Sequence, residues 1–262
     1  MNTSLPNALE SFEEIKRRSA GKRVAFFLDY DGTLTPIVAR PELAVLSERT
    51  RGTVKELAAV STVAIVSGRD RQDVEKRVQI DSLFYAGSHG FDIAGPGGWH
   101  LEHEEGTSAI PRVERVEAEL QAALHSISGV IIERKKFSVA VHYRLARGED
   151  LETIKSSVDQ VLARNTGIRA KDGKKVYELL PDIEWDKGRA VLWLLGKLHP
   201  GDASVLPFYV GDDTTDEDAF RDLRNSGVGI FVGDPPPQTL ARYALQDPRE
   251  VERFLRRWSA RS

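Results

Sequence analysis

The sequence predicts an α/β fold, with a doubly wound parallel-sheet core into which a smaller α+β domain is inserted. In the first and last parts of the chain, short apolar runs alternate with amphipathic helical stretches, as in right-handed βαβ crossovers. In the middle part the order becomes helix, two strands, helix and hairpin, which is typical of an antiparallel sheet. We therefore expect a discontinuous core domain, residues 1–105 and 183–262, and an inserted domain, residues 106–182.

The first part of the chain contains three apolar runs that predict parallel strands. Val24–Leu28 has no polar residue, which indicates a strand buried on both faces. Thr62–Val66 and Leu83–Ala86 predict the next two strands, which end in Ser67-Gly-Arg and Gly87-Ser-His-Gly. Helices are expected at residues 7–19, 47–59 and 72–78, the second of them capped by Ser47, and a hairpin at residues 91–101.

The middle and last parts of the chain predict further helices and strands. In the middle part we expect helices at residues 110–127 and 151–163, strands at 130–133 and 138–144, and a hairpin over 168–180. Asp172 and Gly173 predict the turn of this hairpin. In the last part we expect helices at residues 186–198, 215–223 and 248–258, and strands at 205–210 and 229–232.

The composition excludes several classes of protein. The chain has 262 residues, no cysteine and a formal net charge of −3, so thiolate chemistry, disulfides and a basic nucleic-acid-binding face are not expected. Because there is no cysteine, a metal ion would be held by oxygen or imidazole. The six histidines lack HExxH spacing, which argues against a zinc hydrolase. No apolar run approaches the roughly 18 residues of a membrane span, and the polar segment Met1–Ala20 does not resemble a signal peptide. We expect a cytoplasmic monomer that binds neither nucleic acid nor membrane.

Two aspartates directly follow the first apolar run. Alternate residues of a strand point to the same side, so Asp29 and Asp31 face one way and Tyr30 the other. Carboxylates held side by side repel by roughly 4 kcal/mol at ~4 Å and an effective dielectric of ~20. Such a pair indicates a cation between the two groups or a proton on one of them. The alternative, for this short motif alone, is a solvated turn at a strand end.

Open α/β sheets bind ligands at the edge where their parallel strands end, and four features of this chain are expected to meet there. They are Asp29 with Asp31, the segment Ser67-Gly-Arg, Lys187, and Asp212 with Asp213. Lys187 opens a predicted helix, where a cation opposes the helix dipole at a small energetic cost. By itself it is equally well a tolerated surface lysine, but together with the other features it favours a lysine directed at a phosphate group.

The acid-rich run Gly211–Asp218 predicts both a helix start and a group of metal ligands. Thr215 and Asp218 match a capping box, in which each residue satisfies a backbone N–H group of the first helical turn. Asp212 and Asp213 are not explained in this way, because they precede the helix and directly follow an apolar strand.

Mg²⁺ is the metal ion that these carboxylates suit. It prefers one or two protein carboxylates together with substrate phosphate and water. We expect it to be held by Asp29, Asp212 and the main-chain carbonyl of Asp31. Asp213 and Asp216 are expected to orient the groups around it.

In chain order the motifs are Asp29-x-Asp-Gly-Thr-Leu, Ser67-Gly-Arg, Asp186-Lys-Gly and Gly211-Asp-Asp-x-Thr-Asp-Glu. This series resembles the haloacid-dehalogenase superfamily of phosphohydrolases. Four further stretches, Leu34–Ile37, Gly87–Gly90, Val141–Arg144 and Gly173–Glu178, narrow the resemblance to the trehalose-6-phosphate phosphatase family, over about residues 23–245. The resemblance implies a haloacid-dehalogenase-like core, with a small cap domain inserted after the third strand.

The residues and the resemblance imply the same mechanism. Asp29 attacks phosphorus and forms an aspartyl-phosphate. Asp31 protonates the leaving sugar oxygen and then takes a proton from the attacking water. Mg²⁺ and Lys187 neutralise the phosphoryl oxygens, and Ser67, Gly68 and backbone N–H groups complete the phosphate site.

By the same resemblance, the cap domain recognises the sugar, and Lys174 and Glu178 contact its hydroxyl groups. Glu133, His142 and Arg144 are further candidates for substrate binding. An equal alternative for Glu133 and Arg144 is a cross-strand ion pair on a solvated sheet face.

Two candidates for substrate binding lie in the core domain. His89 lies between Gly87 and Gly90, and these glycines are expected to make the segment flexible enough for His89 to reach the substrate. A lone histidine is more often structural. Arg69 is expected either to bind substrate or to lie on the surface.

The resemblance implies hydrolysis of trehalose 6-phosphate to trehalose and phosphate, as a step of trehalose biosynthesis. One alternative is a phosphatase of another sugar phosphate, such as sucrose phosphate or a glycosyl phosphoglycerate. Another is a non-catalytic sensor of sugar phosphates on the same scaffold. A sensor is expected to lack part of the catalytic set, whereas Asp29, Asp31, Lys187 and Asp212 are all present.

Overall fold

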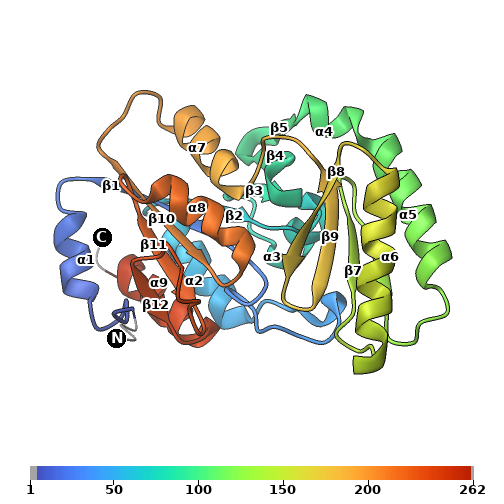
Figure 1. Cartoon of the computed structure of the whole chain (residues 1–262). Helices are drawn as coiled ribbons and strands as arrows, with labels where there is room; N and C mark the ends of the chain where they lie inside the picture. The colour runs from blue at the N-terminus through green and yellow to red at the C-terminus, as the bar shows by residue number, and fades with distance from the viewer. Residues whose placement is uncertain (1–4, 261–262) are drawn as a thin grey trace. The chain divides into compact units, whose positions relative to one another are not determined.

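The computed structural model describes residues 5–260, and the chain forms two compact units (Figure 1). The larger unit consists of the residues up to Leu101 and those from Trp185 onward, and the smaller unit is Glu102–Glu184. The sequence predicted these boundaries at residues 105 and 183. Each unit has a sheet and a hydrophobic core of its own.

The larger unit is built on a sheet that, within the described residues, has eight strands in the order β12-β11-β10-β1-β2-β3-β4-β5. Its first strands are β1 (Arg23–Leu28), β2 (Thr62–Val66), β3 (Phe84–Gly87), β4 (Asp92–Gly95) and β5 (Trp99–Glu102). Its last strands are β10 (Val205–Gly211), β11 (Val228–Val232) and β12 (Tyr243–Leu245). From β12 to β3 the neighbours are parallel, and β4 is antiparallel to β3.

The strand order reverses at β1, which lies between β2 and β10. This arrangement is the doubly wound topology, so the predicted fold class is confirmed. The short strand β12 was not predicted, because its three residues are too few to form a pattern.

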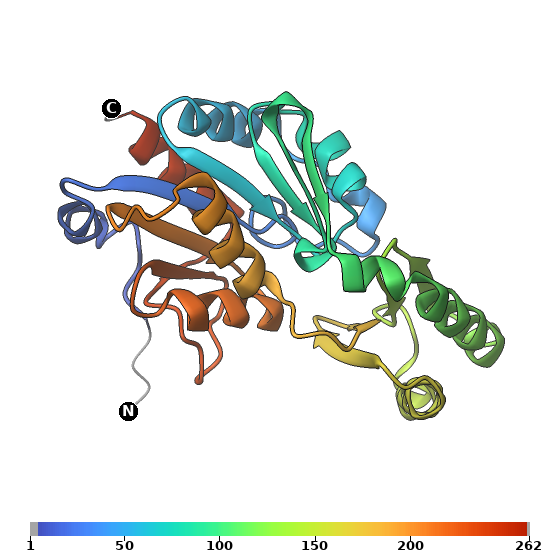
Figure 2. The ribbon, with the colours of Figure 1, turned by 90° about the horizontal axis from the view of Figure 1, so that it is seen from above.

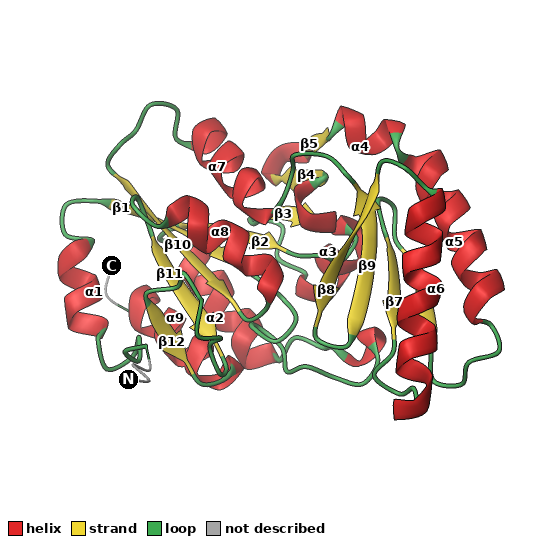
Figure 3. Cartoon of the chain, viewed as in Figure 1, coloured by secondary structure: helices red, strands yellow, loops and turns green. Residues whose placement is uncertain are grey.

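Helices cover both faces of this sheet, as Figures 2 and 3 show. They are α1 (Phe12–Arg18), α2 (Glu48–Ala58), α3 (Arg71–Val78), α7 (Lys187–Leu198), α8 (Glu217–Leu223) and α9 (Pro248–Ser259). Successive residues of β1 point to opposite faces: Phe26 and Leu28 pack with α1, α2, α3 and α9, whereas Ala25 and Phe27 pack with α7 and α8. Because both faces are covered, the central strands are apolar throughout.

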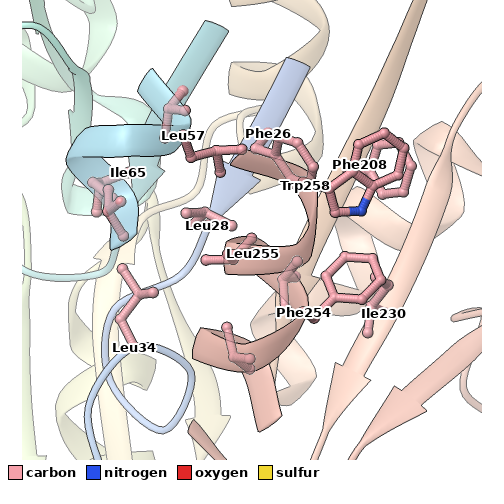
Figure 4. Packing of buried hydrophobic residues seen from close by; sticks show 14 of the residues in the cluster. Phe26, Leu28, Leu34, Leu57, Ile65, Phe208, Ile230, Phe254, Leu255 and Trp258 are labelled. Carbon is pink, nitrogen blue, oxygen red and sulfur yellow. The ribbon is translucent and has the colours of Figure 1, made fainter. Parts of the chain in front are cut away.

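Aromatic side chains fill the first of these faces (Figure 4). Phe26 of β1 stacks on Phe208 of β10 with ring centroids 4.9 Å apart. Trp258 of α9 meets both rings edge-on, at 5.7 and 5.2 Å. Leu255, one turn earlier on α9, is fully buried among them. This packing fixes β1 and β10 side by side, which decides where their last residues lie.

The smaller unit has an antiparallel sheet in the order β6-β7-β9-β8, again within the described residues. The strands are β6 (Ile131–Arg134), β7 (Val139–His142), β8 (Ile168–Gly173) and β9 (Val176–Pro181), and the helices are α4 (Glu104–Ser108), α5 (Ile110–Leu124) and α6 (Leu151–Arg164). Val139 and Leu179 face the helices and pack with Val116 of α5 and Val158 of α6. Alternate residues of these strands point the other way, to the face opposite α5 and α6; among the described residues of this unit no helix packs there in the core cluster, and we call it the helix-free face.

The turn of the β8–β9 hairpin differs from the prediction. It lies at Lys174 and Lys175, because Gly173 pairs with Val176. A turn at Asp172-Gly173 would place Lys171 opposite Lys174, and like charges directly opposite one another are destabilising. In the observed register Lys171 is instead opposite Glu178.

Within residues 5–260, no helix has both the length and the apolar character that a bilayer crossing requires.

We expect Leu255→Ala to lower the free energy of unfolding by about 2–5 kcal/mol, because the cavity left in a packed core is only partly filled by relaxation. Leu192→Ala, also on a helix but 41% exposed, is the matched control and is expected to change stability by about 0.5 kcal/mol or less. Urea unfolding followed by circular dichroism measures both. Equal losses in the two variants would contradict the packing of α9 against the sheet.

Candidate active site

The carboxyl ends of the central strands bring together residues that are far apart in the sequence. Leu28 of β1 pairs with Val210 of β10, and the Asp29 backbone N–H donates to the Val210 carbonyl at 2.9 Å. Asp29 and Asp212 therefore leave neighbouring strands at the same edge of the sheet. Both are buried, with 5% and 3% of their surface exposed.

Lys187 is the first residue of α7, and its preceding residue caps the helix. The Asp186 carboxylate accepts a hydrogen bond from the Arg189 backbone N–H at 2.9 Å. This cap starts the helix at a fixed point and places Lys187 at its N-terminus, where the side chain is only 3% exposed. The alternative of a tolerated surface lysine is therefore wrong.

The Lys187 ammonium group connects two carboxylates. Its Nζ donates to Asp29 Oδ1 at 2.7 Å and to Asp216 Oδ1 at 2.7 Å. All three side chains are buried. Charge-assisted hydrogen bonds of this length are the strong ones, and they compensate for the removal of the charges from water.

Burial and neighbouring charges shift the pKa values of this cluster. Burial raises the pKa of Asp29 well above its ordinary value. Lys187 lowers this pKa, but the negative charges of Asp216 and Asp212 raise it further, so the net shift is upward. Burial lowers the pKa of Lys187, but Asp216 and Asp29 raise it more, so it lies well above its ordinary value. Burial also works against ionised Asp216, yet Lys187 brings the pKa of Asp216 below its ordinary value. Lys187 is thus shared by two carboxylates, of which Asp216 has the lowered pKa and Asp29 the raised one.

Asp216 also organises the loop that follows β10. Its Oδ2 accepts hydrogen bonds from the backbone N–H groups of Asp212 at 2.9 Å and Asp213 at 3.0 Å. Its Oδ1 accepts a hydrogen bond from the hydroxyl of Tyr209 at 2.7 Å, a contact that the sequence did not suggest. The capping box is formed by Asp213 and Asp216, so the predicted box of Thr215 with Asp218 is wrong. The short 3₁₀ turn Thr214–Asp216, which precedes α8, shifts the cap upstream.

Three carboxylates here have the chemistry of a divalent-metal site. Oxygen atoms of Asp29, Asp212 and Asp216 lie within 4.8 Å of one another, and all three residues are buried. Hard oxygen donors suit Mg²⁺, and a cation would stabilise ionised Asp29. Gly32 makes room for this arrangement: a Cβ atom there would lie 2.1 Å from Asp212 Oδ2, and the backbone φ of +80° also favours glycine.

The Asp31 side chain is paired with Arg69. The guanidinium donates to Asp31 through Nε at 2.7 Å and through Nη2 at 2.7 Å, a bidentate bond to both carboxylate oxygens. Arg69 also donates to Asp73 at 2.9 Å and is 7% exposed, so the alternative of a surface arginine is wrong. The Asp31 side chain is 43% exposed. The cation beside Asp31 is therefore this guanidinium.

Ser67, Gly68 and His89 lie at the ends of the neighbouring strands β2 and β3. The Ser67 hydroxyl accepts a hydrogen bond from the Arg69 backbone N–H at 3.1 Å, and the Ser67 carbonyl accepts one from His89 N–H at 2.9 Å. His89 is 4% exposed and has a φ of 56°. The segment is thus a buried, hydrogen-bonded turn and not the flexible loop that its glycines suggested.

In the smaller unit, the β-sheet register places three of the predicted residues on the helix-free face. Glu133 and Glu178 are both opposite Ala140, and His142 lies two residues further along β7. His142 Nε2 and Glu133 Oε2 are hydrogen-bonded at 2.7 Å. Arg144 donates to the Lys174 carbonyl at 2.5 Å. The partner that the structure shows for Glu133 is therefore His142, and Arg144 extends toward the hairpin turn.

Glu178 has partners that the sequence reasoning missed. Its Oε1 accepts hydrogen bonds from Lys135 Nζ at 2.8 Å and from the Ser138 hydroxyl at 2.8 Å. Lys135 directly follows β6, and Ser138 directly precedes β7. Only the pairing of β7 with β9 brings them to Glu178, so no local pattern could have identified them.

Comparisons with known proteins show which family the chain is similar to. A family model described as trehalose-phosphatase matches residues 27–249. The chain is 42% identical over 267 residues to trehalose 6-phosphate phosphatase RA3 of Zea mays, covering 96% of this chain and 74% of that protein. It is 43% identical over 263 residues to a probable trehalose-phosphate phosphatase of Arabidopsis thaliana, covering 96% and 71%. Among solved structures it is similar to the C-terminal domain of C. albicans trehalose-6-phosphate phosphatase, with a TM-score of 0.85, 25% identity and 99% coverage of both chains.

We expect Lys187→Met to lower the free energy of unfolding by about 3–5 kcal/mol in metal-free buffer, because it leaves buried carboxylates without their cation. Lys197→Met, an exposed change on the same helix, is the matched control and is expected to have little effect. Denaturant titration of both variants tests this. A stable Lys187→Met protein would show that the pair with Asp29 and Asp216 is not needed to fold the site.

Proposed function

Because the chain belongs to the trehalose-phosphatase family of the haloacid-dehalogenase superfamily, we propose that it hydrolyses trehalose 6-phosphate to trehalose and inorganic phosphate. It is a phosphoric monoester hydrolase. The observation that carries the proposal is the buried hydrogen bond from Lys187 to Asp29, which places a fixed cation beside a carboxylate at the edge of the sheet.

Asp29 is the proposed nucleophile. One of its oxygens forms a bond to phosphorus while the bond from phosphorus to the sugar oxygen breaks, which gives an aspartyl-phosphate. Water then attacks this phosphorus, releasing phosphate and restoring the carboxylate. The burial of Asp29 supports this role, because few waters compete for its oxygens. Lys187, at 2.7 Å from Oδ1, lies where it can neutralise charge on the phosphoryl group.

Asp31 is the proposed general acid and base. A sugar alkoxide is a poor leaving group, so it needs a proton as its bond to phosphorus breaks. Asp31 lies two residues beyond Asp29 and has an accessible carboxylate. Arg69 donates to both oxygens of this carboxylate at 2.7 Å, so one of these hydrogen bonds has to break before that oxygen can carry the proton that Asp31 donates.

Mg²⁺ is the proposed cofactor. Asp29, Asp212 and the carbonyl of Asp31 would hold the ion. Asp213 and Asp216 would support the loop after β10 that carries Asp212. When bound, the ion supplies positive charge to the phosphoryl oxygens and orients them. Ser67 and Gly68, at the end of β2, are proposed to bind phosphoryl oxygens, and a substrate contact for His89 at the end of β3 remains part of the proposal.

The smaller unit is proposed to be the cap domain, which recognises the sugar. Its helix-free face carries Glu133, His142 and Glu178, whose polar groups match the hydroxyl groups of a disaccharide. Lys174 and Arg144, at the hairpin turn, are proposed to contact the sugar as well. Carboxylates held in fixed positions on a sheet can each accept a hydrogen bond from one sugar hydroxyl group. Such a surface favours a sugar phosphate over a small phosphate ester that has no hydroxyl groups.

We expect the protein to release phosphate from trehalose 6-phosphate in the presence of Mg²⁺ and to lose this activity when EDTA removes the ion. A panel with sucrose 6-phosphate, a glycosyl phosphoglycerate and glucose 6-phosphate provides the control. A higher kcat/KM for any of these would displace trehalose 6-phosphate as the substrate. Full activity in EDTA would remove Mg²⁺ from the proposal.

We expect Asp29→Asn to reduce turnover at least about 1,000-fold, because the amide does not act as a nucleophile. The far-ultraviolet circular dichroism spectrum should be unchanged. Asp81→Asn, an exposed change in the same unit, is the matched control and should keep full activity. Persistent turnover in Asp29→Asn would refute the assignment of the nucleophile.

A further inference from the structure

The Asp216 carboxylate already has a full set of hydrogen-bond donors. A carboxylate accepts about four hydrogen bonds, roughly two on each oxygen. Oδ1 accepts from Lys187 Nζ and from the Tyr209 hydroxyl, both at 2.7 Å. Oδ2 accepts from the backbone N–H groups of Asp212 and Asp213 at 2.9 and 3.0 Å. A metal ion at Asp216 would have to displace one of these four donors.

We propose that Tyr209 is a positioning residue: its hydroxyl occupies the last acceptor site on Asp216 Oδ1, which keeps Lys187 shared between Asp216 and Asp29 and keeps Asp216 out of the metal coordination shell. The proposal separates the three buried carboxylates into two classes. Asp29 and Asp212 are the metal ligands, and Asp216 anchors the lysine. It rests on the proposed Mg²⁺-dependent phosphatase function.

The position of Tyr209 supports this role. The residue lies within β10 and is fully buried in the core. Its ring packs edge-on against Phe220 of α8 with centroids 5.7 Å apart, which fixes the direction of the hydroxyl. A buried hydroxyl needs a partner, and Asp216 supplies it at 2.7 Å. A phenylalanine at this position would make the same ring contacts with Phe220. The hydrogen bond to Asp216, and not the packing, therefore accounts for the hydroxyl group of Tyr209.

The loss of this hydroxyl has a defined consequence for Lys187. Lys187 Nζ is shared between Asp29 and Asp216 at equal distances of 2.7 Å. Without the Tyr209 donor, more of the negative charge on Asp216 Oδ1 is available to the lysine, which is drawn toward Asp216 and away from Asp29. The freed acceptor site also becomes open to a cation. Lys187 is then misplaced for charge stabilisation, while metal binding is not weakened.

Tyr209→Phe tests the proposal. We expect kcat with trehalose 6-phosphate to fall about 10-fold or more, because Lys187 is no longer held beside Asp29 where it stabilises charge on the phosphoryl group. We expect KM to change by less than about twofold, because the sugar contacts are untouched. Tyr85→Phe is the matched control: Tyr85 is 4% exposed and donates to the Ile80 carbonyl at 2.9 Å on strand β3. It should lose stability without a change in kcat. Equal kcat in Tyr209→Phe and the wild type would overturn the proposal.

Calorimetric titration with Mg²⁺ alone is the second readout. We expect the Kd of Tyr209→Phe for Mg²⁺ to equal that of the wild type or to be lower. If Asp216 were a metal ligand and Tyr209 its support, the loss of the hydroxyl would weaken metal binding about 10–100-fold. Such weakening would overturn the proposal. This measurement needs no substrate, so it also decides the matter if trehalose 6-phosphate is not hydrolysed.

A crystal structure of the wild-type protein with Mn²⁺, located by its anomalous signal, covers the case in which Tyr209→Phe does not fold. The proposal expects Asp29 and Asp212 to ligate the ion, and Asp216 to keep its bonds to Tyr209 and Lys187. An Asp216 oxygen bound to the ion would contradict it.

Discussion

A lysine ammonium group buried between two carboxylates is the interaction on which the rest of this site depends. Lys187 is 3% exposed, and removal of a charge from water is costly unless hydrogen bonds and an opposite charge compensate. The compensation comes from Asp29 on β1 and Asp216 after β10. The ends of β1 and β10 and the start of α7 therefore have to meet at one place, and this requirement constrains the arrangement of the larger unit.

Parallel strand pairing provides that placement. The neighbouring strands β1 and β10 end at the same edge, and the aromatic packing of Phe26, Phe208 and Trp258 holds them in register. Glycines then allow the loops to approach closely. A Cβ atom at Gly211 would lie 2.3 Å from the Asp216 carboxyl carbon, so only glycine lets this carboxylate lie against the strand end. The positions of the site residues therefore depend on the packing of the core and on close approach at glycine.

The acids of the site differ because their partners differ. Asp29 shares one cation with Asp216, and its pKa is raised by burial. Asp216 has four donors and stays ionised. Asp31 is held by the guanidinium of Arg69 at a more exposed position. Residues of one chemical type can therefore serve as nucleophile, anchor and acid–base group, because each carboxylate is set in different surroundings.

Local patterns in the sequence determined the fold class, most strands and helices, and the residues that reach the sheet edge. Apolar runs, cap residues such as Ser47 and Asp186, and the rule that parallel strands end together are sufficient for this. The tertiary structure alone decided the partners: Tyr209 on Asp216, Arg69 on Asp31 and Lys135 on Glu178. The physical reason is that a hydrogen bond depends on distances of a few tenths of an ångström and on which acceptor site is still free. Those quantities arise only when separate elements pack together, so no local pattern contains them.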